Sequence, residues 1–372
     1  MKKLLPFIIA LLPVFGYSQT DSVLVLSDVH IDLRKPFDTF YHIDTDPRVF
    51  LSAAANAKAG KYSFIIMPGD LLRHTTKAEN DTHDVADMKL SYKYVIKNIK
   101  AIDKRAIILP ALGNNDCIAH NIPNAATYKV FYDALLKRID RGGRIKKSFL
   151  AGGYYAYEKD SLAIIILNTV LFMRENDSLA IEAKAELVWL KEKLQSLKPG
   201  QSAWLVYHVP PGIDRYGKTP SWQDSIQATY LQIIKQYAPR IKLQLAGHTH
   251  MVDARLLVDS GKLLSYIAIA PGLDSRNGNN PAYQVLHYNQ SDKRASQITT
   301  WYTDALSNYA WHSFAFKNLD FGFFKDGSSD NSLGLDFIRH YTTCRGATQA
   351  KDKTAIAWDD TFRGISTIKI PD

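Results

Sequence analysis

Five short polar clusters, each placed directly after an apolar run, most constrain how this chain can fold. The apolar runs are rich in Val, Ile and Leu and about as long as buried strands; they are residues 23–27, 64–68, 107–112, 204–207 and 241–246. The polar clusters that follow them are Asp28-Val29-His30, Gly69-Asp70, Gly113-Asn114-Asn115-Asp116, His208 and Gly247-His248-Thr249-His250. Because sites in α/β proteins form where parallel strands end, we expect these side chains to meet.

The chemistry of the clusters predicts a metal site, because their side chains offer oxygen and nitrogen ligands without a thiolate. These side chains are Asp28, His30, Asp70, Asn114, His208, His248 and His250. On an extended backbone, Asp28 and His30 would point to the same side and could bind one ion together. A single histidine after a strand is more often structural. All five clusters in this order favour two divalent ions that share one carboxylate.

The order Asp-x-His, Gly-Asp, Gly-Asn-x-Asp, His and Gly-His-Thr-His, spread over residues 22–302, resembles the calcineurin-like metallophosphoesterase superfamily. Two further features resemble its acid sphingomyelinase-like branch. His74 stands four residues after Asp70, where that branch carries a catalytic histidine. The segment Asn279-Asn280-Pro281 resembles a late motif of the same branch.

The resemblance implies how the predicted ligands divide between two metals. The first metal would be held by Asp28, His30 and His250, the second by Asn114, His208 and His248, and Asp70 would bridge them. Two divalent ions about 3.5–4 Å apart acidify a bridging water and neutralise phosphoryl oxygens during in-line attack. The resemblance implies zinc, with manganese or iron as alternatives, because imidazole and carboxylate ligands suit all three.

Asn115 departs from the family pattern, which usually has histidine at this position. An amide can donate a hydrogen bond but cannot deliver a proton at neutral pH. General acid catalysis contributes about 10²–10⁴-fold and matters most when the leaving oxygen is poor. The change therefore favours phosphoanhydride or activated phosphodiester substrates. Gly-Asn-Asn-Asp followed by His120-Asn121 also resembles the endopolyphosphatases of this branch, so His120 and His74 are the candidate replacement donors.

We therefore expect an enzyme that hydrolyses phosphodiester or phosphoanhydride bonds in polyphosphate or nucleotide-type substrates. The first alternative is a sphingomyelinase-like phosphodiesterase that acts on phospholipid head groups. The second is a metal-containing binding protein whose catalysis was lost with the histidine at position 115. The intact ligand set argues against the second alternative.

Charge fits an anionic, phosphate-containing substrate. The formal net charge is +9, and removal of Lys2 and Lys3 would lower it to +7. A basic surface raises the local concentration of polyanions without identifying them. The chain has no dense Lys/Arg block or other motif of a nucleic-acid binder, and the sequence does not predict an oligomeric state.

The N-terminus predicts export. Residues 1–18 combine Lys2-Lys3, a short apolar stretch and small residues, as in a cleaved signal peptide, and the stretch is too short for a membrane anchor. No other run approaches membrane length, so we expect a secreted or periplasmic protein. Export would permit a disulfide between Cys117 and Cys344, although two distant cysteines do not establish one.

Strand and helix patterns alternate until residue 246 and hairpin-like strands follow. We expect an α/β fold over residues 19–302 in which two mixed β-sheets pack face to face as a sandwich flanked by helices. Residues 303–372 are expected to form a small, mostly helical subdomain with a helix at Leu333–Thr343. The helices expected in the main domain are residues 48–59, 85–100, 125–140, 183–197 and 222–237.

Overall fold

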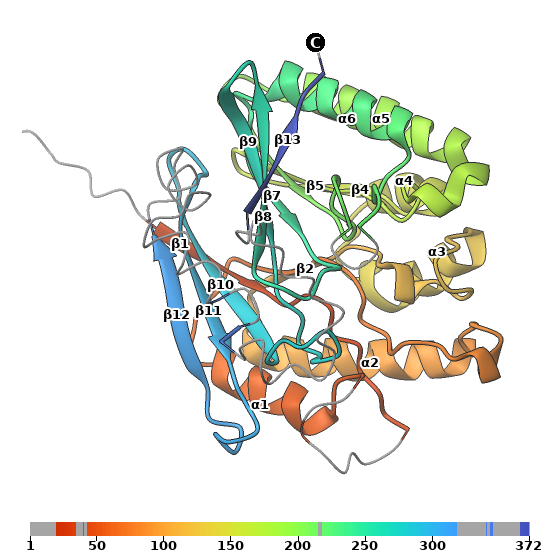
Figure 1. Ribbon diagram of the computed structural model, residues 1–372, viewed down its shortest axis with the longest axis vertical. Helices are drawn as coiled ribbons and strands as arrows, with labels where there is room; N and C mark the ends of the chain where they lie inside the picture. Colours follow the sequence, from red (N-terminus) through yellow and green to blue (C-terminus); the bar gives the residue numbers. More distant parts are fainter. Residues whose placement is uncertain are drawn as a thin grey trace, which may run out of the picture.

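Two mixed β-sheets face each other in the computed structural model, with helices on their outer sides (Figure 1). The structure describes residues 20–34, 40, 43–214, 218–317, 340, 343–344 and 365–371. The first sheet has the order β12-β11-β10-β1-β2-β3 and the second the order β13-β8-β9-β7-β6-β5-β4. The predicted fold class is confirmed.

The strands that precede the polar clusters run parallel to their neighbours. The first sheet contains β1 (Thr20–Val25), β2 (Phe64–Met67), β3 (Ile107–Pro110), β10 (Ala282–Asn289), β11 (Ala295–Tyr302) and β12 (His312–Lys317). The second contains β4 (Tyr155–Lys159), β5 (Leu162–Ile166), β6 (Ser202–Val206), β7 (Ile241–Ala246), β8 (Asp253–Asp259), β9 (Lys262–Ile269) and β13 (Ile365–Lys369). Strands β1, β2 and β3 are mutually parallel, as are β5, β6, β7 and β9, so their carboxyl ends gather at one edge of each sheet.

Six α-helices are described, and side chains cap the first three of them. They are α1 (Pro47–Ala57), α2 (Val85–Ile102), α3 (Ala125–Phe131), α4 (Arg144–Gly152), α5 (Ala180–Gln195) and α6 (Asp224–Tyr237). The carboxylate of Asp46 caps α1 and that of Asp84 caps α2 by accepting hydrogen bonds from first-turn amides. Helices α1 and α2 lie outside the first sheet, and α5 and α6 outside the second (Figure 1).

The helix predicted over residues 125–140 is wrong in length. Helix α3 passes into a π-helical turn at Tyr132–Leu136, and α4 begins at Arg144. Asp140 explains the break, because its carboxylate accepts hydrogen bonds from the backbone amides of Ile145 at 3.0 Å and Lys146 at 2.8 Å. It thereby satisfies first-turn amides of α4, which the sequence analysis did not predict.

Strand alternation divides the second sheet between two cores. Ile164 and Trp204 face the first sheet, whereas Ile165 and Leu205 pack under α5 and α6. Trp204 is fully buried and meets Tyr288 of β10 edge to face, with ring centroids 4.8 Å apart. Burial of each large apolar side chain contributes about 1.5–3 kcal/mol, so the two sheets hold the strand ends in a fixed relation.

The segment after residue 302 contributes strands where it is described. Strand β12 extends the first sheet and β13 pairs with β8 in the second. Most of the expected helix Leu333–Thr343 lies outside the described residues, so the boundary at residue 302 stays a prediction. The expected signal peptide, residues 1–18, also lies outside them. Within the described ranges, no helix is both long and apolar enough to cross a bilayer.

Cys117 forms no disulfide within the part of the chain that the structure describes, which includes Cys344. Its thiol is fully buried and instead lies 3.7 Å from the carbonyl oxygen of Gly113. The bridge between Cys117 and Cys344 that export would permit is therefore not present. Burial also raises the pKa of the Cys117 thiol well above its ordinary value, as for an inert core residue.

Candidate metal centre

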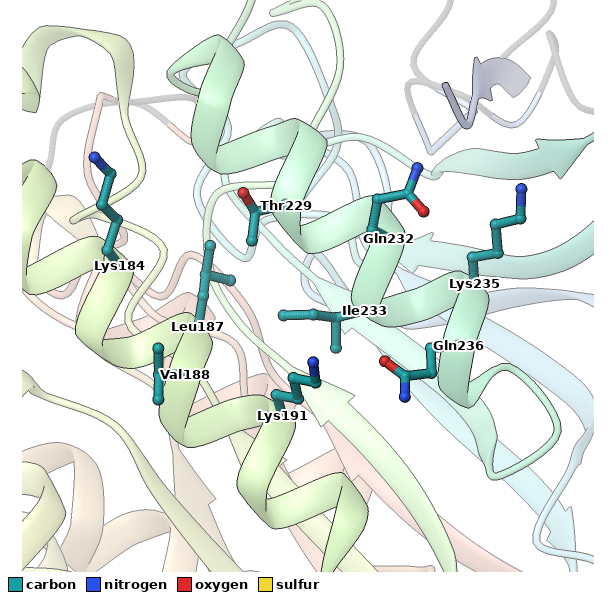
Figure 2. Close-up of a pocket in the computed structure, with 9 residues that line it drawn as sticks. All are labelled: Lys184, Leu187, Val188, Lys191, Thr229, Gln232, Ile233, Lys235 and Gln236. Carbon is teal, nitrogen blue, oxygen red and sulfur yellow. The ribbon is translucent and has the colours of Figure 1, made fainter. Parts of the chain in front are cut away.

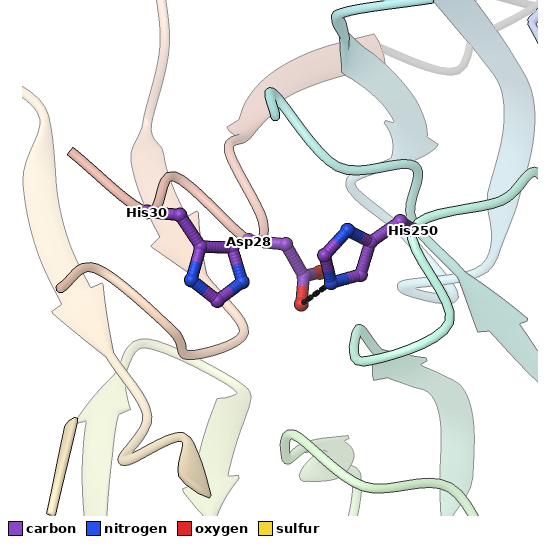
Figure 3. A group of neighbouring side chains, drawn as sticks. All are labelled: Asp28, His30 and His250. Atoms are coloured by element: carbon purple, nitrogen blue, oxygen red, sulfur yellow. Dashed lines mark ion pairs between the residues drawn. The ribbon is translucent and has the colours of Figure 1, made fainter. Parts of the chain in front are cut away.

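The polar clusters meet at the carboxyl ends of the parallel strands. One group consists of Asp28, His30 and His250, each offering a ligand atom within 4.8 Å of the other two. Figure 3 shows the two imidazoles converging on the carboxylate of Asp28 from the loops after β1 and β7. Nε2 of His250 lies 3.4 Å from Oδ1 of Asp28. All three side chains are buried.

A second group lies against the first and shares the carboxylate of Asp28. Asp28, Asp70 and His208 also offer ligand atoms within 4.8 Å of one another. Oδ2 of Asp70 stands 3.4 Å from Nε2 of His30 and 3.2 Å from Nε2 of His208. Asp70 therefore lies between a histidine of each group, which is the position a bridging carboxylate needs.

Asn114 and His248 complete the second group. Oδ1 of Asn114 lies 2.8 Å from Nε2 of His208 and 3.2 Å from Nδ1 of His248. The amide group of Asn114 is held in this orientation because its Nδ2 donates to Oδ1 of Asn121 at 2.9 Å. The structure thus brings together all seven side chains that the sequence analysis selected as ligands.

The local backbone differs from the expected geometry. Asp28 and His30 were expected on an extended segment, but β1 ends at Val25 and their φ angles are 48° and 40°. Asp70, His248 and His250 also have positive φ, at 54°, 73° and 62°. Such values are uncommon outside glycine. The side chains converge because tight loops turn them inward. The argument from strand alternation was therefore wrong, although the ligand atoms of Asp28 and His30 do lie within 4.8 Å of each other.

Backbone hydrogen bonds between the loops support this conformation. The amide of Asp28 donates to the carbonyl of Gly69 at 3.1 Å, and that of His30 to the carbonyl of Asp70 at 3.0 Å. Gly69, with φ of 112°, and Gly113 permit the close approach. A Cβ atom on Gly113 would lie 2.1 Å from Oδ1 of Asp70, so the loops after β2 and β3 can touch only without a side chain there.

Hydrogen bonds at Nδ1 direct the opposite nitrogen of two histidines into the centre. Nδ1 of His30 lies 2.9 Å from the carbonyl oxygen of Leu72, and Nδ1 of His208 lies 2.9 Å from that of Pro68. A carbonyl oxygen accepts only, so each Nδ1 carries the proton and Nε2 keeps a lone pair for a metal. Nε2 of His30 is buried and has no hydrogen-bond partner among the described residues.

Burial and mutual attraction shift the pKa values in the centre. Burial alone would lower the pKa of His208, but Asp70 and Asp28 outweigh it and raise that pKa to about 9. Burial likewise opposes Asp274 and Asp28 at His250, whose pKa is also raised to about 9. Burial would raise the pKa of Asp70, yet His208 and His30 hold it well below its ordinary value. Divalent cations would replace the protons that these histidines otherwise hold.

Three supporting carboxylates received no role in the sequence analysis. Asp116 is fully buried and accepts hydrogen bonds from the amides of Leu71 at 3.0 Å and Gly113 at 2.9 Å, which joins the loops after β2 and β3. Asp274 contacts Nδ1 of His250, and Asp44 lies beside His74. Asp116 could have been found from its place in the Gly-Asn-Asn-Asp motif. No motif around Asp274 or Asp44 in the sequence indicates that either residue supports the centre.

The three candidate catalytic residues occupy different positions. The ring of His74 stacks on that of His30, with centroids 4.0 Å apart, and its Nδ1 lies 2.7 Å from Oδ1 of Asp44. Asn115 is buried, and its Nδ2 donates to Oδ2 of Asp70 at 2.8 Å. Nε2 of His120 lies 3.4 Å from Nδ2 of Asn114. Asn115 therefore holds the central carboxylate, whereas His74 and His120 flank the centre.

A groove of about 600 Å³ between α5 and α6 is a separate feature of the surface (Figure 2). Leu187 and Ile233 face each other across it, and Lys184, Lys191 and Lys235 lie around them. None of its lining residues is a histidine, aspartate or glutamate. The groove therefore lacks the donor set that the loops at the strand ends provide.

An α/β sandwich with clustered Asp, Asn and His side chains beyond its parallel strands defines a metallophosphoesterase. A family model described as calcineurin-like phosphoesterase matches residues 22–252 of this chain. The chain belongs to this family, as its motifs predicted. The family is hydrolytic and uses divalent metals.

Curated relatives fall in the branch that the motifs indicated. The cyclic GMP-AMP phosphodiesterase SMPDL3A of Rattus norvegicus is 26% identical over 257 residues, covering 64% of this chain and 57% of the relative. Sphingomyelinase phosphodiesterase D of Dictyostelium discoideum is 23% identical over 240 residues, covering 61% and 55%. The endopolyphosphatase of Schizosaccharomyces pombe is 26% identical over 212 residues, covering 52% and 34%. The chain thus spans about half the length of these relatives, or less.

Proposed function

We propose that this chain is a secreted binuclear-metal phosphoesterase that hydrolyses phosphodiester or phosphoanhydride bonds, with polyphosphate or nucleotides as substrates. The observation that carries the proposal is the position of Asp70. Its Oδ2 lies 3.4 Å from Nε2 of His30 and 3.2 Å from Nε2 of His208. One carboxylate oxygen shared by two imidazoles from different loops suits two cations better than one.

The donor set fits the proposed division of ligands. Asp28, His30 and His250 would hold one ion; Asn114, His208 and His248 the other; Asp70 would bridge them. Two supporting observations are the buried Nε2 of His30, without a hydrogen-bond partner among the described residues, and the Asn114 oxygen aimed at two imidazoles. When bound, the ions supply Lewis-acid polarisation and a more acidic water. Zinc is the proposed metal, with manganese and iron as alternatives.

The surrounding side chains would orient the substrate and manage protons. Asn115 uses its amide on Asp70, so it would fix the bridging carboxylate and leave proton donation to another group. His74 is held by Asp44 beside His30, and His120 lies next to Asn114. We assign His74 and His120 as the candidate proton donors to a leaving oxygen. A phosphate leaving group needs such a donor less than an alkoxide does.

The relatives' names keep a phospholipid head group as a second candidate substrate, since two of them are named as sphingomyelinase phosphodiesterases. The alternative of a binding protein without catalysis is weaker, because the predicted ligands lie together and hydrogen bonds to the carbonyl oxygens of Leu72 and Pro68 orient His30 and His208. Export rests on the expected signal peptide, residues 1–18. N-terminal sequencing of the protein recovered outside the cytoplasm would test the cleavage.

Asp70→Asn tests the ligand assignment, with Asp177→Asn, an exposed aspartate in the 3-10 helix Arg174–Leu179, as the matched control. We expect Asp70→Asn to lower metal content and to reduce turnover of bis-p-nitrophenyl phosphate, ATP and polyphosphate by at least about 100-fold. The control should retain both. Full activity with unchanged metal stoichiometry in Asp70→Asn would refute the assignment. A metal-loaded wild-type protein inactive on all three substrates and on sphingomyelin vesicles would refute the enzymatic proposal.

A further inference from the structure

We propose that a relay of three amide side chains, running from Asn176 through Asn121 to Asn114, sets the affinity of the centre for the second of its two ions. The relay deepens the proposed function and rests on it, because it presupposes two ions. Asn121 and Asn176 are positioning residues, since each acts on a predicted ligand through hydrogen bonds to other residues. The predicted ligands of the first ion lie outside the relay, so its loss should affect one ion and spare the other.

The side chain of Asn114 suits an ion in only one of its two orientations. Its Oδ1 lies 2.8 Å from Nε2 of His208 and 3.2 Å from Nδ1 of His248, whereas a flipped amide would present N–H donors there. Nδ2 of Asn114 donates to Oδ1 of Asn121 at 2.9 Å. The acceptor on Asn121 therefore selects the orientation in which the oxygen of Asn114 faces the two histidines.

Asn121 is itself held in place by Asn176. Asn121 has a left-handed φ of 64°, which asparagine adopts more readily than most residues. Its carbonyl oxygen accepts a hydrogen bond from Nδ2 of Asn176 at 2.8 Å. Asn176 is buried and lies in the 3-10 helix Arg174–Leu179, where its φ of −100° and ψ of 35° are not helical. This short helix is thus interrupted at the residue whose amide reaches the loop after β3.

The same amino group of Asn176 also supports the loop that carries His208. Nδ2 of Asn176 donates its other hydrogen to the carbonyl of Val170 at 2.7 Å. Val170 follows Thr169, whose Oγ1 accepts a hydrogen bond at 2.9 Å from the amide of Val209, the residue after His208. Asn176 therefore joins the loop after β3 to the loop after β5. Two predicted ligands of the second ion depend on this one amino group.

The histidines of the first ion take their support from other segments. Nδ1 of His30 lies 2.9 Å from the carbonyl oxygen of Leu72, and the carboxylate of Asp274 contacts Nδ1 of His250. Neither contact involves the loop after β5 or the 3-10 helix Arg174–Leu179. Replacing a partner that orients a metal ligand typically lowers metal affinity by about 10- to 100-fold. Loss of the relay should therefore weaken the second ion by this factor and leave the first unchanged.

The test measures zinc binding to metal-free protein by titration calorimetry, in which wild type should bind two ions per chain. Asn121→Gly removes the acceptor and suits the left-handed backbone, so it should weaken only the second ion, by about 10- to 100-fold. Asn176→Ala removes both donated hydrogen bonds and should have the same effect. Asn121→Asp keeps an oxygen that accepts from Nδ2 of Asn114, so it should lose no affinity for either ion.

NMR signals of the imidazoles identify which ion is weakened. In Asn121→Gly, one equivalent of zinc should shift the signal of His30 but not that of His248. Asn98→Ala on α2 is the matched control, because it also removes a side-chain amide that donates to a carbonyl, that of Tyr94 at 2.9 Å. This control should bind both ions as wild type does. Circular dichroism would show whether Asn176→Ala folds; if it does not, the two variants of Asn121 decide alone.

Equal weakening of both ions in Asn121→Gly, or unchanged affinity for both, would overturn the relay. A loss in Asn121→Asp as large as that in Asn121→Gly would also overturn it. A wild type that binds two ions but hydrolyses neither bis-p-nitrophenyl phosphate, ATP nor polyphosphate would count against the proposed function alone, because the relay is measured by metal affinity. A wild type that binds a single ion would overturn both.

Discussion

Replacing Gly113 by alanine would place a methyl group against the central carboxylate and should separate the architecture of the site from the stability of the fold. The φ angle of Gly113 is −97°, which alanine adopts without strain, so the effect would be purely steric. The new Cβ would lie 2.1 Å from Oδ1 of Asp70 and 2.2 Å from its backbone nitrogen. Rotation of the Asp70 side chain relieves only the first contact, so the loops after β2 and β3 must move apart.

The size of the displacement follows from these distances. Ordinary contacts of a Cβ atom begin at 3.4 Å, so an atom at 2.1 Å must retreat by at least 1.3 Å. Oδ2 of Asp70 now lies 3.2 Å from Nε2 of His208, and such a shift would break this relation. A misplacement of about 1 Å costs on the order of 100-fold in rate. Overpacking of this kind also lowers the free energy of unfolding by about 1–3 kcal/mol.

Gly60→Ala is the matched control, because its Cβ would meet an atom at a similar distance away from the centre. The nearest atom is the hydroxyl oxygen of Tyr62, at 2.2 Å, which donates a hydrogen bond to the carbonyl of Ala57 at 2.8 Å. We expect both variants to lose stability in chemical denaturation. Only Gly113→Ala should lose bound metal and about 100-fold in kcat. Wild-type turnover and metal stoichiometry in Gly113→Ala would refute the argument that contact between these loops sets the position of Asp70.

Two further predictions concern the proton donor and the metals. Asn115→His should improve hydrolysis of esters with poor leaving groups more than anhydride cleavage, measured as kcat on alkyl and phosphoanhydride substrates, and equal gains would discredit the leaving-group argument. In metal-free protein, His208 and His250 have folded pKa values raised to about 9 from 6.5. Their contribution to stability is therefore complete below pH 6.5 and lost as pH rises to 9, so chelated protein should lose thermal stability over this range. Metal-loaded protein, with neutral imidazoles, should not show this loss. If the melting temperatures of the two forms change with pH in the same way, His208 and His250 are not metal ligands.

The strands that carry the site could be predicted because they are buried on both faces. Such strands appear in the sequence as short continuous apolar runs, and β7 at Ile241–Ala246 matches its predicted range. The polar residues at their ends are equally visible, so the composition of the centre could be deduced. Helix α4 was missed because its sequence lacks the usual start signals. Its flanking residues are Gly143 and Gly153, and its first turn is basic rather than acidic.

The rest of the site could not be predicted, because it depends on contacts between segments that are distant in sequence. Asp274 acts on His250 only because the segment after β9 packs against Asp28, and nothing near position 274 in the sequence encodes that contact. The same holds for Asp44 and His74, which lie 30 positions apart in sequence. The spacing Asp-x-His is compatible with an extended strand and with a left-handed turn. Only the structure distinguishes them, through φ angles of 48° at Asp28 and 40° at His30.

The residues in left-handed conformation identify the part of the site that substitutions should disturb most. Each such residue costs about 1–2 kcal/mol and persists only where surrounding contacts determine it. The buried carboxylate of Asp116 and the backbone bonds from Asp28 to Gly69 supply those contacts. Changes to this inner framework should therefore impair every substrate alike.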